Sequence, residues 1–170
     1  IVGRTALAGD DGERIRVTRT FKPSNAAADL AVLYLERPAQ AATVQLAGPQ
    51  DTALEQPGRR ATTAGWGATG QSPEEGLTFD DQLRAVNQVI LPQRRCAKVY
   101  GRFWAPQTTL CVTSVNAGED ICHGDSGGPL IVDGRLVGVA SFDADRRCGQ
   151  GNSPSGYTRV VPFHEWIMRF

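Results

Sequence analysis

The residues best suited to chemistry lie in one short stretch, residues 122–130, which reads Cys-His-Gly-Asp-Ser-Gly-Gly-Pro-Leu. Ser126 stands between an acidic residue and two glycines, and glycines allow a tight turn that can approach a substrate closely. Such a turn can aim the N–H groups of Gly124 and Ser126 at one point, where a negatively charged oxygen would be held. A glycine-rich surface turn explains any three of these residues but not the whole stretch. The pattern therefore predicts a nucleophilic serine with its own oxyanion-binding site.

This stretch resembles the Gly-Asp-Ser-Gly-Gly-Pro signature of the trypsin/chymotrypsin family of serine peptidases. Further segments resemble the family in the family's order: Ala-Asp-Leu-Ala-Val-Leu from Ala28, Ala-Gly-Trp-Gly from Ala64, Ser-Phe from Ser141, Gly-Tyr-Thr-Arg-Val from Gly156, and the closing segment from Pro162. The resemblance covers almost the whole chain. It implies a serine endopeptidase that cleaves peptide bonds through an acyl-enzyme.

Short strands separated by turns dominate the rest of the pattern. Strands are expected at 15–17, 30–35, 82–91 and 136–140, the second of them buried, with a short helix at 94–100 and a longer one at 162–170. Asp133-Gly134 is a strong hairpin signal. With the resemblance, this predicts an all-β fold of two Greek-key six-stranded β-barrels, the first truncated, and a C-terminal α-helix. Residues 1–50 would form the partial first barrel, 51–160 the second barrel and 161–170 the closing helix.

The resemblance assigns the catalytic roles. Ser126 is the nucleophile, and Asp29 matches the aspartate that orients the general base. The base of the family is a histidine in an Ala-Ala-His-Cys segment, which this sequence lacks. The only histidines are His123, which is expected to rim the substrate pocket, and His164, which is expected to face solvent from the closing helix. We therefore expect the chain as given to be inactive.

The first residues, Ile1-Val2-Gly3, resemble a mature N-terminus of the family, whose amine pairs with the aspartate before the nucleophile. That aspartate is Asp125 here, so the resemblance assigns it the activation ion pair. However, Gly-Arg-Thr replaces the usual Gly-Gly, and the residues that follow resemble the stretch between the catalytic histidine and aspartate. The sequence is accordingly interpreted as a fragment whose Ile1 is internal to the complete domain.

The resemblance also implies a primary specificity pocket, formed by Asp120, Ile121, Ser141, Phe142, Asp143 and Ser155. A carboxylate at its floor, Asp120, favours a Lys or Arg side chain in the substrate. Ile121, Asp143 and Ser155 depart from the family's usual residues. Asp143 either adds a second charge for a basic substrate or obstructs the mouth, and the sequence leaves both readings open.

Four cysteines are present, and their spacing alone allows three pairings. No Cys-x-x-Cys pair occurs, so zinc binding is disfavoured. The resemblance selects Cys96–Cys111 and Cys122–Cys148. Disulfides indicate an oxidising compartment, so the protein is expected to be secreted.

The charges balance, with 18 basic and 18 acidic residues, so neither nucleic acid nor a membrane is expected as a partner. The expected partners are polypeptide substrates and protein inhibitors, and the complete protein is expected to be a monomer. No metal or organic cofactor is implied. Basic residues around the short helix are explained as a solvated face; they are Arg94, Arg95, Lys98 and Arg102.

Two other functions compete with the peptidase. A non-catalytic binding module could use the same fold, since fold alone does not fix function. Against it, Ser126, Asp125, Gly124 and Asp29 are all intact, and only one contiguous block is missing. A different hydrolase with a Gly-x-Ser-x-Gly elbow also matches the bare pattern, but that elbow lies between a strand and a helix. Here Pro129 is followed by the strand-like Leu-Ile-Val.

Overall fold

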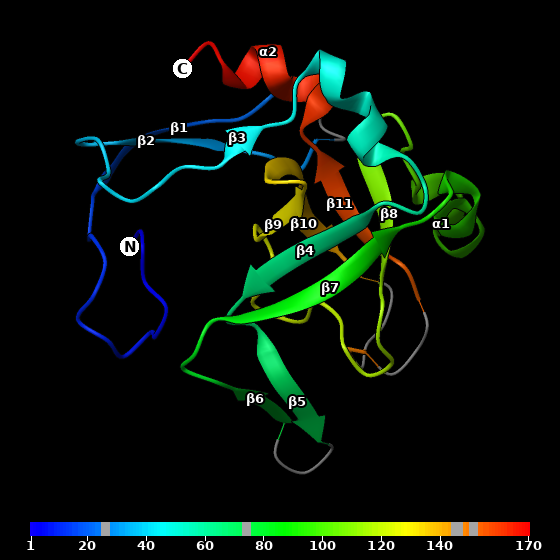
Figure 1. The fold of residues 1–170 in the computed structure, drawn as a ribbon, viewed down its shortest axis with the longest axis horizontal. Helices are drawn as coiled ribbons and strands as arrows, with labels where there is room; N and C mark the ends of the chain where they lie inside the picture. The colour runs from blue at the N-terminus through cyan, green and yellow to red at the C-terminus, as the bar shows by residue number, and fades with distance from the viewer. Residues whose placement is uncertain (25–27, 73–75, 144–147, 150–152) are drawn as a thin grey trace.

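The computed structural model describes residues 1–24, 28–72, 76–143, 148–149 and 153–170. Its centre is a closed barrel of six antiparallel strands (Figure 1). The strands are β4 (Arg60–Gly65), β7 (Arg84–Ile90), β8 (Thr109–Ser114), β9 (Pro129–Val132), β10 (Arg135–Phe142) and β11 (Ser155–Arg159). They follow one another around the barrel in the order β11-β8-β7-β4-β9-β10, and pairing of β10 with β11 closes the ring.

The barrel core follows from alternation along the strands. In β4, Ala61 and Thr63 are buried while Arg60 and Thr62 are exposed, as expected for a strand with one face toward the core. Large apolar side chains from three other strands fill the interior, and Leu130, Val137 and Tyr157 are all fully buried. This confirms the all-β prediction for the second barrel.

The hairpin between β9 and β10 has the turn that its sequence predicts. Asp133 and Gly134 have φ values of 47° and 75°. Positive φ at both central residues is the geometry of a two-residue hairpin turn that matches the twist of the strands. The turn pairs Val132 with Arg135 and so sets the register of β9 on β10.

The described part of the first 50 residues forms no closed barrel. Strands β1 (Val17–Phe21) and β2 (Val32–Leu35) make a separate antiparallel pair, and β3 (Gln45–Leu46) joins β10 of the main barrel in parallel. The expectation of a buried strand at 30–35 is wrong, because Leu33 is 54% exposed. Its side chain has no second sheet to pack against among the described residues. The expected strand at 15–17 begins only at Val17, and the division of the chain at residue 50 stays a prediction.

Several short helical segments and one further hairpin surround the barrel. A 3-10 helix, η1 (Pro49–Glu55), precedes β4, and β5 (Ala68–Ser72) pairs with β6 (Gly76–Phe79) outside the barrel. Helix α1 (Gln93–Tyr100) continues into η2 (Gly101–Phe103) and confirms the predicted short helix. None of the helices in the described ranges has the length and apolar character needed to cross a membrane.

The closing helix is shorter than predicted. A 3-10 turn, η3 (Val161–Phe163), leads into α2, which spans only His164–Ile167. Beyond it, the ring of Phe170 stacks on Phe21 of β1, with 4.2 Å between the centroids. The end of the chain therefore packs against the first strand of the chain and not only against the barrel.

Candidate active site

The loop between β8 and β9 carries Ser126 in a sequence of tight turns. Gly124 and Gly127 have φ values of 100° and 85°, which L side chains rarely adopt. The Asp125 N–H donates to the Cys122 carbonyl and the Gly128 N–H donates to the Asp125 carbonyl, each at 2.9 Å. Ser126 lies exposed at the apex between these two turns.

The loop is anchored to β10 of the barrel directly after its serine. The Gly127 N–H donates to the Ala140 carbonyl of β10 at 2.8 Å, and the Ala140 N–H donates to the Gly128 carbonyl at 2.9 Å. Within the part of the chain that the structure describes, the N–H groups of Gly124 and Ser126 donate to no protein acceptor. Two backbone donors beside an exposed serine are therefore available to a ligand.

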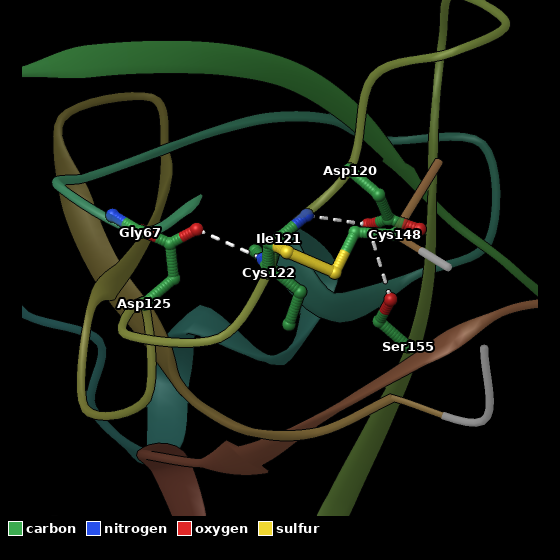
Figure 2. Close-up of a disulfide and its surroundings, with 7 residues drawn as sticks. All are labelled: Gly67, Asp120, Ile121, Cys122, Asp125, Cys148 and Ser155. Atoms are coloured by element: carbon green, nitrogen blue, oxygen red, sulfur yellow. Dashed lines mark hydrogen bonds between the residues drawn. A yellow bond between two sulfur atoms is a disulfide. The ribbon is translucent and has the colours of Figure 1, made fainter. Parts of the chain in front are cut away.

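Asp125 holds the inner side of the loop. Its Oδ1 accepts from the Gly67 N–H at 2.8 Å and its Oδ2 accepts from the Cys122 N–H at 2.9 Å (Figure 2). This position of the Asp125 carboxylate requires glycine at residue 65, the last residue of β4, and at residue 67 just beyond it. A Cβ added to Gly65 or Gly67 would lie 2.0 Å or 2.3 Å from a carboxylate oxygen of Asp125.

We expect Gly67→Ala to destabilise the chain by about 1–3 kcal/mol, the usual cost of forcing an extra carbon into a filled space. Gly67 does not have positive φ, so backbone strain does not contribute. Urea unfolding measures the change. In an Asp125→Ala background the same substitution should cost much less, since the clashing carboxylate is gone. An equal cost in both backgrounds would contradict this account.

Asp29 belongs to the first part of the chain but is bound to the barrel. The Ser141 hydroxyl donates to Asp29 Oδ2 at 2.7 Å, and the Thr158 hydroxyl donates to the Asp29 carbonyl oxygen at 2.9 Å. Ser141 lies on β10 and Thr158 on β11. The carboxylate is thus fixed on the side of the barrel that also anchors the Ser126 loop.

The two histidines lie on different elements, one on the Ser126 loop and one at the start of α2. His123 lines the same cavity as Ser126, with its carbonyl accepting from the Ala68 N–H at 2.9 Å. His164 begins α2 and is half-buried, so the expectation that it faces solvent is wrong. Among the described residues, no hydrogen bond joins either imidazole to Ser126 or Asp29.

Two cavities lie on either side of the loop that contains Cys122. The smaller, of 250 Å³, contains Ser126 and four of the six residues expected in the specificity pocket; these are Ile121, Ser141, Phe142 and Asp143. Asp120 lines the larger cavity, of 540 Å³, together with Asp125 and Gly67. The sixth expected residue, Ser155, is fully buried. The cavities share Ile121 and the Cys122–Cys148 disulfide as a common wall.

Asp120 is held by three donors that converge on one oxygen. Its Oδ1 accepts from its neighbour's backbone, Ile121 N–H, at 2.8 Å, from the Ser155 hydroxyl at 3.1 Å and from the Gln88 amide at 3.2 Å (Figure 2 shows the first two). Burial raises the pKa of Asp120 to about 6, and the nearby charge of Asp143 adds to this, although the hydrogen bonds oppose it. The carboxyl is therefore an acid that titrates close to neutral pH.

Both disulfides implied by the resemblance are formed. Cys96 pairs with Cys111, with 5.7 Å between their Cα atoms, and Cys122 pairs with Cys148 at 5.3 Å. The first ties α1 to β8. The second joins the Ser126 loop to the segment after β10, where both cavities meet (Figure 2).

Three kinds of contact at this site were not predicted from the sequence. Gln88 is fully buried and supports Asp120, and the available signal was an amide at an inward position of β7, between Val86 and Ile90. The need for glycine at 65 and 67 follows only from the position of Asp125. No sequence signal indicated that Thr158 binds the backbone of Asp29.

Comparison with known proteins identifies the class to which this barrel and serine loop belong. The family model described as Trypsin matches residues 2–167. The chain therefore belongs to the trypsin family of serine peptidases. It is 36% identical over 148 residues to rat submandibular glandular kallikrein-3, covering 87% of this chain and 76% of the relative. Mouse kallikrein-1 is 38% identical over 141 residues, which is 82% of this chain and 51% of that protein.

A solved structure of neuropsin, a serine protease expressed in the limbic system of mouse brain, superposes with a TM-score of 0.78 at 28% identity. The match covers 98% of this chain and 76% of that chain. The chain thus spans between about half and three quarters of the length of these relatives.

Proposed function

We propose that the chain supplies the nucleophile, the oxyanion site and the orienting acid of a secreted serine endopeptidase. One observation carries the proposal. Beside the exposed Ser126, the N–H groups of Gly124 and Ser126 have no acceptor among the described residues, while Ser141 holds the Asp29 carboxylate on the same side of the barrel. Membership of the trypsin family supports the same reaction. Two disulfides support secretion into an oxidising compartment.

In the proposed reaction, the Ser126 hydroxyl attacks the carbonyl carbon of a peptide bond. An imidazole accepts the hydroxyl proton and later donates it to the leaving amine. The N–H groups of Gly124 and Ser126 bind the developing oxyanion, and Asp29 accepts from the imidazole and stabilises its charged form. The acyl group on Ser126 is then transferred to water. Because no hydrogen bond joins either histidine to Ser126 or Asp29 among the described residues, the proposal assigns this imidazole to a segment other than residues 1–170.

The proposed substrates carry Arg or Lys at the cleaved position. A basic side chain would enter the cavity beside Ser126, where Asp143 contributes a carboxylate, and extend toward Asp120 behind Ile121. In a site partly shielded from water, such a charge pair discriminates strongly between basic and neutral side chains. Polypeptides are therefore the proposed partners, and the pocket selects among them by charge.

Fluorophosphonate labelling tests the proposal. Residues 1–170 alone should not be labelled, whereas the complete gene product that contains them should be labelled at Ser126 and should cleave after Arg or Lys. Ser126→Ala in that product removes both signals. Prompt labelling of residues 1–170 would show that another group activates the serine, and a complete product that is never labelled would overturn the peptidase assignment.

A non-catalytic binding module on the same fold is the second candidate, favoured because no hydrogen bond joins an imidazole to Ser126 or Asp29 among the described residues. It predicts that the complete gene product binds basic peptides without cleaving them. Labelling at Ser126 would exclude it.

A further inference from the structure

Acidic residues are absent from a long part of the sequence. Between Asp81 and Glu119 there is no aspartate or glutamate, although the chain averages about one acidic residue in nine. Four basic residues lie in the middle of this interval, and we call them the basic face; they are Arg94, Arg95, Lys98 and Arg102. A neutral protein thus concentrates positive charge in one place.

The structure places the whole basic face in solvent. All four side chains are exposed on α1 and η2. None of them forms an ion pair with a described residue. By contrast, seven other arginines each have a carboxylate partner; they are Arg4, Arg16, Arg37, Arg59, Arg84, Arg135 and Arg159. The charge of the basic face is therefore not neutralised within the described part of the molecule.

The helix that carries this face is fixed to the barrel. Cys96, fully buried, is bonded to Cys111 of β8. Gln93 accepts from the Trp104 indole N–H at 2.9 Å and donates to the Thr109 carbonyl at 3.2 Å. Figure 1 shows α1 at one edge of the molecule, on the opposite side of the barrel from the N-terminus. Little ordering of the backbone would therefore accompany binding to this surface.

We propose that the basic face binds a linear sulfated polysaccharide. Arg94 and Lys98 lie one turn apart, about 6 Å along the helix axis, and Arg102 follows in η2 after α1 ends at Tyr100, so four exposed cations stand within nine residues of the chain. A group of several exposed cations suits a polymer with successive anionic groups better than a single small anion, which needs a built pocket. The disulfides indicate an extracellular compartment, where sulfated glycans and not nucleic acids are the common polyanions.

An anionic membrane is the main competing occupant, because Phe103 next to the basic face is 77% exposed. However, the Arg102 guanidinium lies over the Phe103 ring, 5.0 Å from its centroid. The cation thus covers part of the one aromatic side chain that would insert into lipid. This arrangement favours a hydrated polyanion over a lipid surface, and vesicles therefore serve as the competing probe in the test.

Calorimetry with a heparin octasaccharide at 50–200 mM NaCl tests the proposal on the 170-residue chain. We expect binding that weakens with salt, since each charge contact releases a counterion. Arg94→Gln with Lys98→Gln should weaken binding by about tenfold or more and lower the salt slope by about 1.5 to 2. The matched control is Arg14→Gln with Arg60→Gln, two exposed arginines that likewise form no ion pair with a described residue, which should change binding by less than about twofold.

Thermal unfolding followed by circular dichroism should be the same for both double variants, because all four side chains are exposed. The proposal is overturned if the chain does not bind heparin, if the two double variants weaken binding equally, or if phosphatidylserine vesicles bind the chain and heparin does not displace them. The measurement needs no catalytic activity, so it is independent of the peptidase proposal.

Discussion

Replacing Asp120 by asparagine should weaken binding of benzamidine, an aromatic amidinium, by about 30- to 4000-fold. This range converts a cost of about 2–5 kcal/mol, which is typical when one partner of a shielded charge pair is removed. Asparagine keeps one oxygen for the donors around Asp120, so the loss should reflect charge and not a collapse of the pocket. Displacement of p-aminobenzamidine, followed by its fluorescence, measures the affinity without requiring catalysis.

The matched control is Glu119→Gln, which removes the neighbouring exposed carboxylate and should change benzamidine affinity little. If Glu119→Gln weakens benzamidine binding as much as Asp120→Asn does, then the loss of affinity reflects the overall negative charge of this region and not a specific contact with Asp120. If Asp120→Asn leaves binding unchanged while Asp143→Asn abolishes it, then the carboxylate in the cavity of Ser126 determines specificity, and the assignment of Asp120 is wrong.

The raised pKa of Asp120 adds a dependence on pH with a defined sign. Below a pH of about 6 the carboxyl is protonated and neutral, so benzamidine affinity should fall as pH is lowered through 6 in the unmodified chain but not in Asp120→Asn. Stability should move the opposite way. Between the ordinary pKa of 3.8 and about 6, the folded chain keeps a proton that the unfolded chain has released, so stability falls as pH rises. Asp120→Asn should therefore raise Tm relative to the unmodified chain above pH 6 and much less at pH 4.

Removal of the Cys122–Cys148 disulfide is expected to have the second large effect. Its cysteines are 26 residues apart, and closing a loop of this length stabilises a protein by about 3 kcal/mol. Because both cysteines line both cavities, the double serine variant should also lose benzamidine binding. Urea unfolding and the fluorescence displacement assay measure the two effects.

The other disulfide provides the comparison. Cys96 and Cys111 are 15 residues apart and line neither cavity, so their double serine variant should lose a similar stability but keep its ligand affinity. Equal loss of binding in both variants would mean that the pocket depends on overall stability and not on the local covalent tie.

Elements set by local sequence were predicted well. The Asp133-Gly134 hairpin and the helix at Gln93–Tyr100 depend on contacts between near neighbours, and both formed as predicted. The strand predicted at 30–35 is present as β2, but its predicted burial is wrong, because burial of Leu33 requires a partner sheet that the described residues do not provide. The closing helix ends at Ile167, earlier than predicted, and the ring of Phe170 beyond it stacks on Phe21.

At the site, the motif predicted the Ser126 loop, and the family resemblance selected the disulfides. What sequence could not provide was the direction of side chains that meet from distant strands. Asp120 faces the larger cavity because Gln88 and Ser155, on β7 and β11, hold its carboxylate there. Such a preference depends on the three-dimensional arrangement of three separate segments, and no spacing in the sequence encodes it.

Asp29 takes its position from Ser141 and Thr158, on the neighbouring barrel, through its own carboxylate and carbonyl. Asp29 lies in the connection between β1 and β2, and neither of these strands contributes a hydrogen bond to its carboxylate in the described structure. A protein engineer could therefore replace the side chains of β1 and β2, or graft a histidine-bearing strand beside them, without having to rebuild the contacts that hold the acid.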